Sequence, residues 1–366
     1  MPGGGAYACG VASDLAGGAS APSASPSRRA MTCAMIECMG NVASSAPMIA
    51  PTLAACIDPR VLADADAHAA AFARRDPFRH VVIDGFFTPD YAASLLAQFP
   101  AFERGNARNE AGEIGGKSTV ERIRGLGAPW ATLDDLVRSQ PFLDLVGRLT
   151  GIEALLYDPF YFGGGTHENR EGQDLDPHVD FNRHPVEGWH RRLNLIVYLN
   201  HEWDDAWGGS LELHSDPRSP DDRVTRVTPL FNRAVIFETT EWSWHGFDRI
   251  ALPRERRDLS RKSIALYFYT RERPEEELAG THSTIYVDRP LPGRFRAGLT
   301  LDEADVDELR VMLARRDQHN QRLYRDITRI TSELERSRDA LYSGVFGRTR
   351  YFVGLARRAL QRLHDR

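Results

Sequence analysis

The amino-acid sequence predicts a mainly β fold, a barrel or a two-sheet jelly roll, with helices before the β region and one long helix after it. Two observations predict the β region: short apolar runs recur between residues 155 and 270, and Gly, Pro, Asn and Asp separate them. A third, an apolar spacing of three and four near the C-terminus, predicts the long helix. With 366 residues, 42% of them hydrophobic, the chain can form one large domain with appendages or two domains.

Residues 1–57 are rich in Ala, Gly, Ser and Pro and show neither helical nor strand periodicity. Such a segment buries too little apolar surface to offset its ordering entropy, so we expect a disordered, low-complexity tail. The first 27 residues contain no Lys or Arg, which argues against a secretory signal and favours a cytoplasmic protein. The cysteines of this segment form no CxxC pair, so neither a zinc site nor a disulfide framework is expected. They are Cys9, Cys33, Cys38 and Cys56.

Residues 58–154 are expected to form a supporting region of helices and one strand. The segment DPRVLADADAHAAAFARR is typical of a helix, and PFRHVVIDGFF is typical of a strand. Thr88 followed by Pro89 predicts a helix start, with Thr as the N-cap and Pro at the first helical position. By the same N-cap logic, a further helical stretch is expected from Thr132 to about Leu149.

Residues 155–290 are expected to form the β core. Its strands are predicted at LLYDPFYF, RRLNLIVYLN, GSLELH, RVTRV, AVIFET, KSIALYFYT and TIYVD. Gly208 and Gly209 mark a tight turn before the third of these runs.

Residues 300–366 are expected to form a long helix and a basic tail. A capping box at Thr300 and Glu303 predicts a helix that runs to about Leu341. Its apolar residues alternate at spacings of four and three, with a polar gap at Ser337, which is typical either of a coiled coil or of a helix packed on the chain's own body. They are Leu323, Ile327, Ile330, Leu334 and Leu341. After Gly347, arginines interleave with apolar residues; this end either contacts a partner or membrane surface or is solvated.

One short segment, DPHVDFN, contains a candidate metal site. On an extended strand His178 and Asp180 point the same way, so an imidazole nitrogen and a carboxylate can share one metal. His245 lies 67 residues later, after the apolar run AVIFET, and offers a third ligand. Two histidines and one carboxylate leave coordination positions open for a co-substrate and O2, which suits Fe(II). Other histidines are expected to be solvated or satisfied in the core: His167, His184, His190, His201 and His214.

A candidate carboxylate site follows on the last long strand. Period 2 places Arg261 and Ser263 on one face and Lys262 on the other. A guanidinium with a neighbouring hydroxyl matches a carboxylate, because Arg offers a two-pronged fork of donors.

Residues 77 to 288 resemble the 2-oxoglutarate- and Fe(II)-dependent oxygenases of the prolyl 4-hydroxylase-like group. The motifs that carry the resemblance occur in the same order: HVDFNRH, RRLNLIVYLN, WGGSLELH, WHG and RKSIALYFYT. The resemblance implies a double-stranded β-helix (jelly-roll) core. Lys occurs only at positions 117 and 262 and Arg is abundant, a composition typical of GC-rich bacterial genomes.

The resemblance also implies roles for individual residues. His178, Asp180 and His245 would be the iron ligands, and Arg261 with Ser263 would bind the distal carboxylate of 2-oxoglutarate. The co-substrate site would also include Tyr198 and Asn194. The implied reaction hydroxylates an unactivated carbon with O2 and releases succinate and CO2, with L-ascorbate as a reductant for the iron.

Two departures from the family pattern concern Arg261. Related enzymes often have Lys in its place, and Lys262 is adjacent. The spacing from His245 is also long, and Arg256 or Arg257 would fit the usual count, although both lie in the polar run PRERRD. Strand alternation favours Arg261.

The composition argues against some classes of function, and other classes stay open. A net charge of −5 argues against a general nucleic-acid binder, and no run approaches the roughly 18 apolar residues of a membrane span. The alternatives are a cupin-like sugar-binding or isomerase module, and a catalytically dead scaffold that assembles through its C-terminal helix. The substrate stays open among a prolyl side chain, a free amino acid, and a glycan or lipid-linked molecule.

Overall fold

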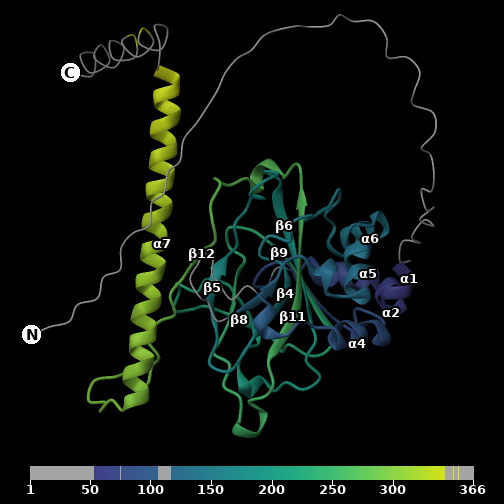
Figure 1. The fold of residues 1–366 in the computed structure, drawn as a ribbon, viewed down its shortest axis with the longest axis horizontal. Helices are drawn as coiled ribbons and strands as arrows, with labels where there is room; N and C mark the ends of the chain where they lie inside the picture. Colours follow the sequence, from purple (N-terminus) through teal and green to yellow (C-terminus); the bar gives the residue numbers. More distant parts are fainter. Residues whose placement is uncertain (1–52, 75, 106–116, 343–348, 350–352, 354–366) are drawn as a thin grey trace, which may run out of the picture. The chain divides into compact units, whose positions relative to one another are not determined.

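The computed structural model describes residues 53–74, 76–105, 117–342, 349 and 353. Two antiparallel sheets form the centre of this part, helices α1 to α6 precede most of the strands, and helix α7 follows them (Figure 1). The expected fold class, a double-stranded β-helix core with N-terminal helices and a long C-terminal helix, is confirmed. Residues 1–52 and the arginines after Gly347, for which a disordered tail and a basic end were expected, lie outside the described residues.

The larger sheet has the order β1-β9-β6-β11-β4-β2, with β3 also paired to β11. Its centre is formed by the two longest apolar runs of the chain, and Ser263 of β11 stands opposite Tyr198 of β6. The bounds are β1 His80–Asp84, β2 Ser118–Val120, β3 Leu156–Tyr157, β4 Gly165–Asn169, β6 His190–Tyr198, β9 Arg233–Glu238 and β11 Arg261–Thr270.

The smaller sheet has the order β12-β5-β10-β7-β8. It packs on the larger sheet through a small apolar cluster in which Leu211 and Leu213 meet Tyr198, Val235 and Phe237. Its strands are β5 Leu175–Val179, β7 Leu211–His214, β8 Val224–Val227, β10 Trp244–Phe247 and β12 Ile285–Tyr286.

The N-terminal helices cover the outer face of the larger sheet. Strand alternation sends Leu193, Leu195 and Val197 of β6 outward, where they join one large core cluster with helix residues such as Trp130 and Phe142. The inner face carries the apolar residues that meet the smaller sheet and, beside them, buried polar residues such as Asn194 and Ser263. The α-helices are α1 Leu53–Cys56, α2 Pro59–Ala63, α3 Ala65–Phe72, α4 Pro89–Ala97, α5 Ala128–Val137, α6 Gln140–Thr150 and α7 Glu303–Tyr342. The 3-10 helices are η1 Phe102–Arg104, η2 Ile123–Leu126, η3 Asp205–Trp207, η4 Arg254–Arg256 and η5 Glu275–Glu277.

Two expected boundaries differ from the structure. The folded part begins at least five residues before Asp58, because α1 is helical from Leu53 and both Cys56 and Ile57 are buried. The single helix expected from residue 132 to 149 is two helices, α5 and α6. Ser139 separates them in an extended conformation, and Pro141, which has no N–H to donate, occupies the first turn of α6. The helix expected at Pro89 is present as α4, with Thr88 at the N-cap position as expected. The Thr88 hydroxyl, however, donates to the Ala55 carbonyl and makes no capping hydrogen bond.

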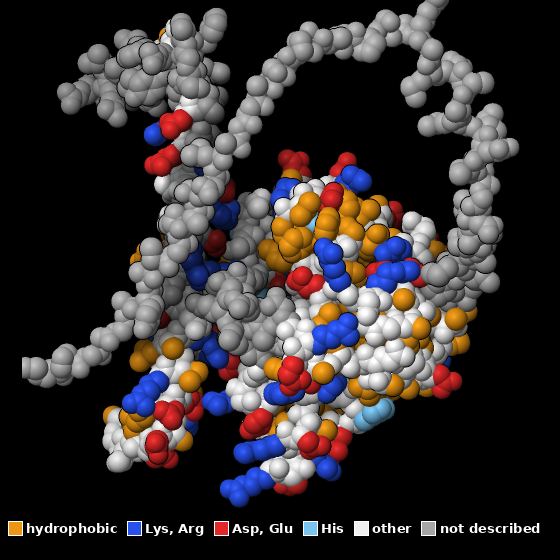
Figure 2. Space-filling view, viewed as in Figure 1, with side chains coloured by type: hydrophobic (Ala, Val, Ile, Leu, Met, Phe, Trp, Pro, Cys, Tyr) orange, Lys and Arg blue, Asp and Glu red, His pale blue; other side chains and the backbone are white. Residues whose placement is uncertain are grey.

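Helix α7 docks on the β core through polar contacts. Arg315 pairs with Asp174 at 2.6 Å and with Asp176 at 3.2 Å, and His319 pairs with Asp288 at 2.7 Å. Charged side chains of both signs are intermixed on the face of the described residues seen in Figure 2. In the described part of the chain, no helix combines the length and apolar character that crossing a bilayer requires.

Two deletions test the observed start of the fold. Deleting residues 1–50 should leave the free energy of unfolding unchanged, because that segment has too few apolar residues in a periodic pattern to pack. Deleting residues 1–58 should lower it by about 3–6 kcal/mol, because the buried side chains of Cys56 and Ile57 are lost at roughly 1.5–3 kcal/mol each. Urea denaturation of both proteins measures the difference, and equal midpoints would place the start of the fold later in the chain.

Candidate active site

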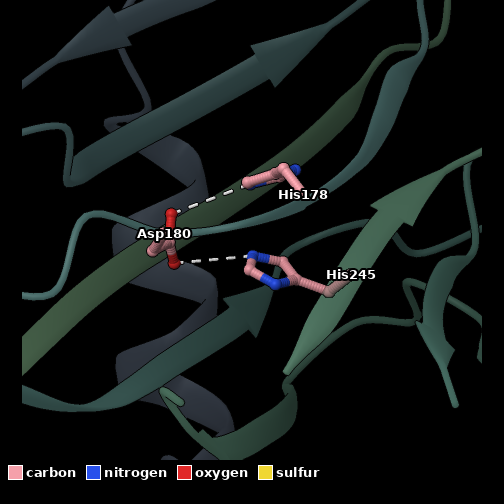
Figure 3. A group of neighbouring side chains, drawn as sticks. All are labelled: His178, Asp180 and His245. Atoms are coloured by element: carbon pink, nitrogen blue, oxygen red, sulfur yellow. Dashed lines mark ion pairs between the residues drawn. The ribbon is translucent and has the colours of Figure 1, made fainter. Parts of the chain in front are cut away.

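Three side chains from the smaller sheet converge on one point (Figure 3). His178 of β5 and His245 of β10 stand directly opposite each other in the antiparallel register, and Asp180 follows two residues after His178. Asp180 Oδ1 lies 3.7 Å from His178 Nε2, and Asp180 Oδ2 lies 3.5 Å from His245 Nε2. The structure therefore brings together all three residues that the sequence indicated as metal ligands.

Backbone carbonyls orient both imidazoles for metal binding. His178 Nδ1 lies 2.9 Å from the Asp176 carbonyl oxygen, and His245 Nδ1 lies 2.9 Å from the Ser243 carbonyl oxygen. A carbonyl only accepts, so Nδ1 carries the proton in each ring and the Nε2 lone pair faces Asp180. Burial lowers the pKa of His178 to about 3, and burial also lowers the pKa of His245. Both rings are neutral at pH 7, which is the form that binds a metal.

Asp180 is held as a carboxylate by neighbours that the sequence did not reveal. Burial by itself would raise its pKa, but the nearby Arg191 guanidinium and the two imidazoles lower it overall. Arg191 Nη2 lies 3.0 Å from Asp180 Oδ2, and Asn194 donates to the same oxygen at 2.7 Å. Arg191 is itself buried, with its guanidinium 3.7 Å from the centre of the Tyr267 ring. Asn194, expected in the co-substrate site, thus contacts a candidate metal ligand.

This donor set fits a ferrous ion. Two imidazole nitrogens and one carboxylate, with their ligand atoms within 4.8 Å of one another, are the ligand types of non-haem Fe(II) centres that keep positions open for other molecules. A second cluster with metal-ligand chemistry, formed by Asp176, Asp288 and His319, does not fit a cation. Guanidinium groups already neutralise its carboxylates, in ion pairs with Arg289, Arg315 and Arg316.

Arg261 begins β11 inside the protein. Its side chain is buried, its Nη2 donates to the Tyr198 hydroxyl at 3.1 Å, and its Nε donates to the Gly209 carbonyl at 2.6 Å. Gly209 has a φ of +71°, and a Cβ there would lie 2.9 Å from the Ile250 side chain. The glycine therefore permits its backbone to pack closely against the side chains of Ile250 and Arg261. Ser263 is also buried and stands opposite Tyr198. Arg261, Tyr198 and Ser263 are therefore gathered at one place.

Among the described residues, no carboxylate forms an ion pair with the Arg261 guanidinium within 4.0 Å, and the Asp248 charge acts on it only from further away. Burial lowers the pKa of Arg261, yet an arginine stays charged in proteins. A buried charge without a carboxylate in direct contact costs several kcal/mol, so a site of this kind is suited to an anion from outside the chain.

The alternative cations have partners elsewhere. Lys262 points to the opposite face of β11, where its ammonium lies 3.2 Å from Glu168 and also contacts Ser260. Arg256 pairs with Glu202 at 2.9 Å near the surface, and Arg257 is exposed. None of the three shares the inner face with Arg261.

Two other histidines have different surroundings. His184, expected to be satisfied in the core, lies 3.1 Å from Asp158 through Nε2, and its Nδ1 accepts from the backbone N–H of Glu187. His167, given no role from the sequence, stands opposite Ser263 across β4 and β11. Burial and then the charge of Lys117 lower the pKa of His167, and Arg261 lowers it further, whereas the Asp180 charge raises it. His167 therefore lines the same inner face as Ser263. Only the pairing of β4 with β11 places it there, and the sequence alone does not reveal which residues pair across strands.

Comparisons with known proteins agree with this geometry. Residues 164–269 match the family model described as the 2OG-Fe(II) oxygenase superfamily. The mouse protein named prolyl 3-hydroxylase OGFOD1 is 27% identical over 153 residues, which cover 37% of this chain and 27% of that protein. The chain thus spans about a quarter of the length of this curated relative.

Solved structures of prolyl hydroxylases are also similar. The prolyl hydroxylase from Trichoplax adhaerens, solved with a hypoxia inducible factor peptide fragment, is 16% identical, with a TM-score of 0.42 and coverage of 58% of this chain and 93% of that one. A prolyl-4-hydroxylase from Pseudomonas putida is 16% identical, with a TM-score of 0.34 and coverage of 56% and 93%.

The matched family segment contains the three candidate metal ligands and the two buried arginines of the site. His178, Asp180 and His245 lie within it, as do the arginines at 191 and 261. Residues 164–269, the part of the chain that carries this site, match the 2OG-Fe(II) oxygenase superfamily.

Proposed function

We propose that this protein is a dioxygenase that uses Fe(II) and 2-oxoglutarate to hydroxylate an unactivated carbon, with release of succinate and CO2. The observation that carries the proposal is the buried Arg261, which has no carboxylate partner among the described residues, in the same sheet sandwich as the His178, Asp180 and His245 donors. A metal site next to a buried anion site is the pair of features that an iron-bound dicarboxylate requires.

Each residue has a distinct task in this proposal. His178, Asp180 and His245 hold the iron, which when bound supplies the activation of O2. The Arg261 fork binds the distal carboxylate of 2-oxoglutarate, and the hydroxyls of Tyr198 and Ser263 add donors beside it. The co-substrate is thereby oriented with its keto acid end toward the metal ligands.

Arg191 and Asn194 act through Asp180. Both bind Oδ2 of this carboxylate, which fixes its rotation and keeps it ionised. Fixing a metal ligand from its far side raises metal affinity and holds the coordination geometry. We therefore assign Asn194 to iron binding through Asp180, in addition to its expected place in the pocket.

A prolyl residue of a protein is the first substrate to test, because the curated relative is named a prolyl 3-hydroxylase. Free amino acids and glycan or lipid-linked molecules are the next classes. L-ascorbate is proposed as the reductant that restores oxidised iron. A cupin-like isomerase or binding module gives Arg261 no role, and the buried guanidinium counts against it.

Succinate release tests the function directly. Protein loaded with Fe(II) under anaerobic conditions is exposed to O2 and 2-oxoglutarate, with and without each candidate substrate. We expect succinate in all samples and a clear increase with the true substrate. A protein that binds iron and 2-oxoglutarate but releases no succinate with any class would be a binding module.

Replacing His178 or Asp180 by Ala should abolish stoichiometric iron binding and succinate release. Each change removes one of only three protein ligands, while the fold keeps its core because neither side chain belongs to an apolar cluster. Metal analysis after gel filtration, with circular dichroism as the folding control, measures the outcome. Wild-type iron content in either variant would contradict the ligand assignment.

Arg261→Ala should weaken 2-oxoglutarate binding by roughly 30-fold or more, corresponding to about 2–5 kcal/mol for a charge left unpaired in a buried site. Lys262→Ala is the matched control, since Lys262 is the next residue on the same strand and pairs with Glu168 on the opposite face. Anaerobic titration of 2-oxoglutarate into the Fe(II) proteins, followed by the metal-to-ligand charge-transfer band, gives both affinities. An equal loss of 2-oxoglutarate affinity in the two variants would refute the assignment of Arg261, rather than Lys262, to the co-substrate site.

Asn194→Ala should lower Fe(II) affinity about tenfold, since changes to groups that hold a metal ligand typically cost 10–100-fold. The affinity for 2-oxoglutarate, measured with saturating iron, should change little. Tyr198→Phe is the complementary variant, because it removes a hydroxyl that contacts Arg261 and should affect 2-oxoglutarate more than iron. If Asn194→Ala weakens only 2-oxoglutarate, then Asn194 belongs to the co-substrate site alone.

A further inference from the structure

Helix α7 carries a row of exposed apolar side chains that no described residue covers. Leu313, Leu323, Ile327, Ile330 and Leu334 have exposed fractions between 55% and 67%. All described side chains from residue 327 to 339 are exposed. Apolar residues in contact with water at this regular spacing would cost stability in a helix that has no other use for them.

This row lies beside the face by which α7 docks on its own β core and does not coincide with it. The docked face is formed by half-buried residues at positions 312, 315, 319, 322 and 326. Arg315 and His319 make the ion pairs described above, and Arg322 donates to the Thr284 carbonyl at 3.2 Å. The chain's own body therefore occupies one face of the helix and leaves the apolar row free.

The spacing of the row is that of a coiled coil. Positions 313, 320, 327 and 334 are seven residues apart and correspond to heptad position a, and positions 316, 323 and 330 correspond to position d. A strict seven-residue repeat has a period of 3.5, whereas a straight helix has 3.6, so the row stays in line only when two helices supercoil. We name residues 313–334 of α7 the seam.

The polar member of the seam indicates which kind of coiled coil forms. Asn320 occupies an a position, is exposed and makes no hydrogen bond within the described residues. A single Asn at a is the device that selects two strands and one register, because the two amides pair only with each other. Arg316 occupies a d position but forms an ion pair with Asp288 of the β core. The N-terminal end of the seam is therefore less apolar than the rest.

The charges that flank the seam favour a parallel pair of identical helices. With two copies in parallel register, Glu333 at position g faces the partner's Arg338 at position e, an attraction that occurs twice. In an antiparallel pair aligned on the same apolar residues, Asp326 would face the partner's Glu333, and this repulsion would offset the attraction of Asp317 for the partner's Arg338. A second copy of the same helix is therefore complementary in both apolar spacing and charge.

We propose that α7 pairs with α7 of a second copy of this chain as a parallel two-stranded coiled coil along the seam. The pairing covers the exposed apolar row and leaves the contacts of the docked face unchanged. The dimer would then carry two β cores, one attached to each helix of the coiled coil.

The assembly state of the full chain tests the proposal. Sedimentation velocity over about 1–100 µM should show a dimer, and Ile327→Asp with Ile330→Asp should raise the dissociation constant by at least about 100-fold, because buried charges would replace four isoleucines. Val311→Asp is the matched control, since Val311 is 51% exposed on the same helix but outside the seam. A monomeric wild type at 100 µM, or a dimer that survives the double change, would overturn the proposal. The second result would place the contact on another surface.

A second variant is expected to strengthen the association of the two copies, a result that a misfolded protein would not give. Asn320→Ile should tighten association at least about tenfold and permit species larger than a dimer. The reason is that the polar residue at this a position lowers the stability of the coiled coil and restricts it to two strands. An assembly unchanged by Asn320→Ile would contradict the seam register.

Oxidative cross-linking distinguishes the two orientations. In a chain whose Cys9, Cys33 and Cys38 are replaced by Ser, Ile330→Cys should form a covalent dimer on oxidation, because d positions lie opposite each other only in the parallel pair. A dimer that stays free of this disulfide would rule out the parallel arrangement.

Discussion

The antiparallel pairing of β5 with β10 is the constraint on which the site depends. His178 and His245 are direct partners in this register, and their ring centres lie 4.3 Å apart. Side chains alternate along a strand, so a slip of one residue would turn one imidazole to the opposite face of the sheet and leave the metal with two ligands. β7 and β12 flank the pair, and Tyr286 of β12 packs its ring against that of His178 at 5.1 Å. The register is thus held from both sides.

The inner face of the larger sheet provides the charges that the smaller sheet needs. Asp180 brings one negative charge into the interior, and Arg191 balances it at 3.0 Å. Arg261 brings a buried positive charge that makes no ion pair within 4.0 Å among the described residues, although Asp248 acts on it from further away. Under the proposed function, a bound dicarboxylate would offset the cost of this buried charge. The two sheets therefore place one balanced pair of charges, Asp180 with Arg191, and one cation without an ion pair, Arg261, in the same interior.

The helices determine which face of the larger sheet is available for chemistry. Apolar residues of β6 and β11 that point outward are covered by α5 and α6, among others. The residues that alternate with them, including Asn194, Tyr198 and Ser263, face the smaller sheet. Helix α7 approaches from the other sheet, where Arg315 binds Asp176, the residue whose carbonyl orients His178. The helix that carries the seam is in this way linked to the metal ligands.

The sequence by itself determined the features that depend on local periodicity. His178 and Asp180 on one side of a strand, and Arg261 with Ser263 on one face of another, follow from the two-residue repeat alone. The helix of α7 and its apolar spacing follow from the same kind of pattern. Only the tertiary structure decided which strands are neighbours. Arg191 at Asp180, His167 opposite Ser263, and the division of one expected helix into α5 and α6 depend on pairing and packing between distant segments. The physical reason is that strand register is set by how the two sheets bury their faces together, and no local repeat specifies that choice.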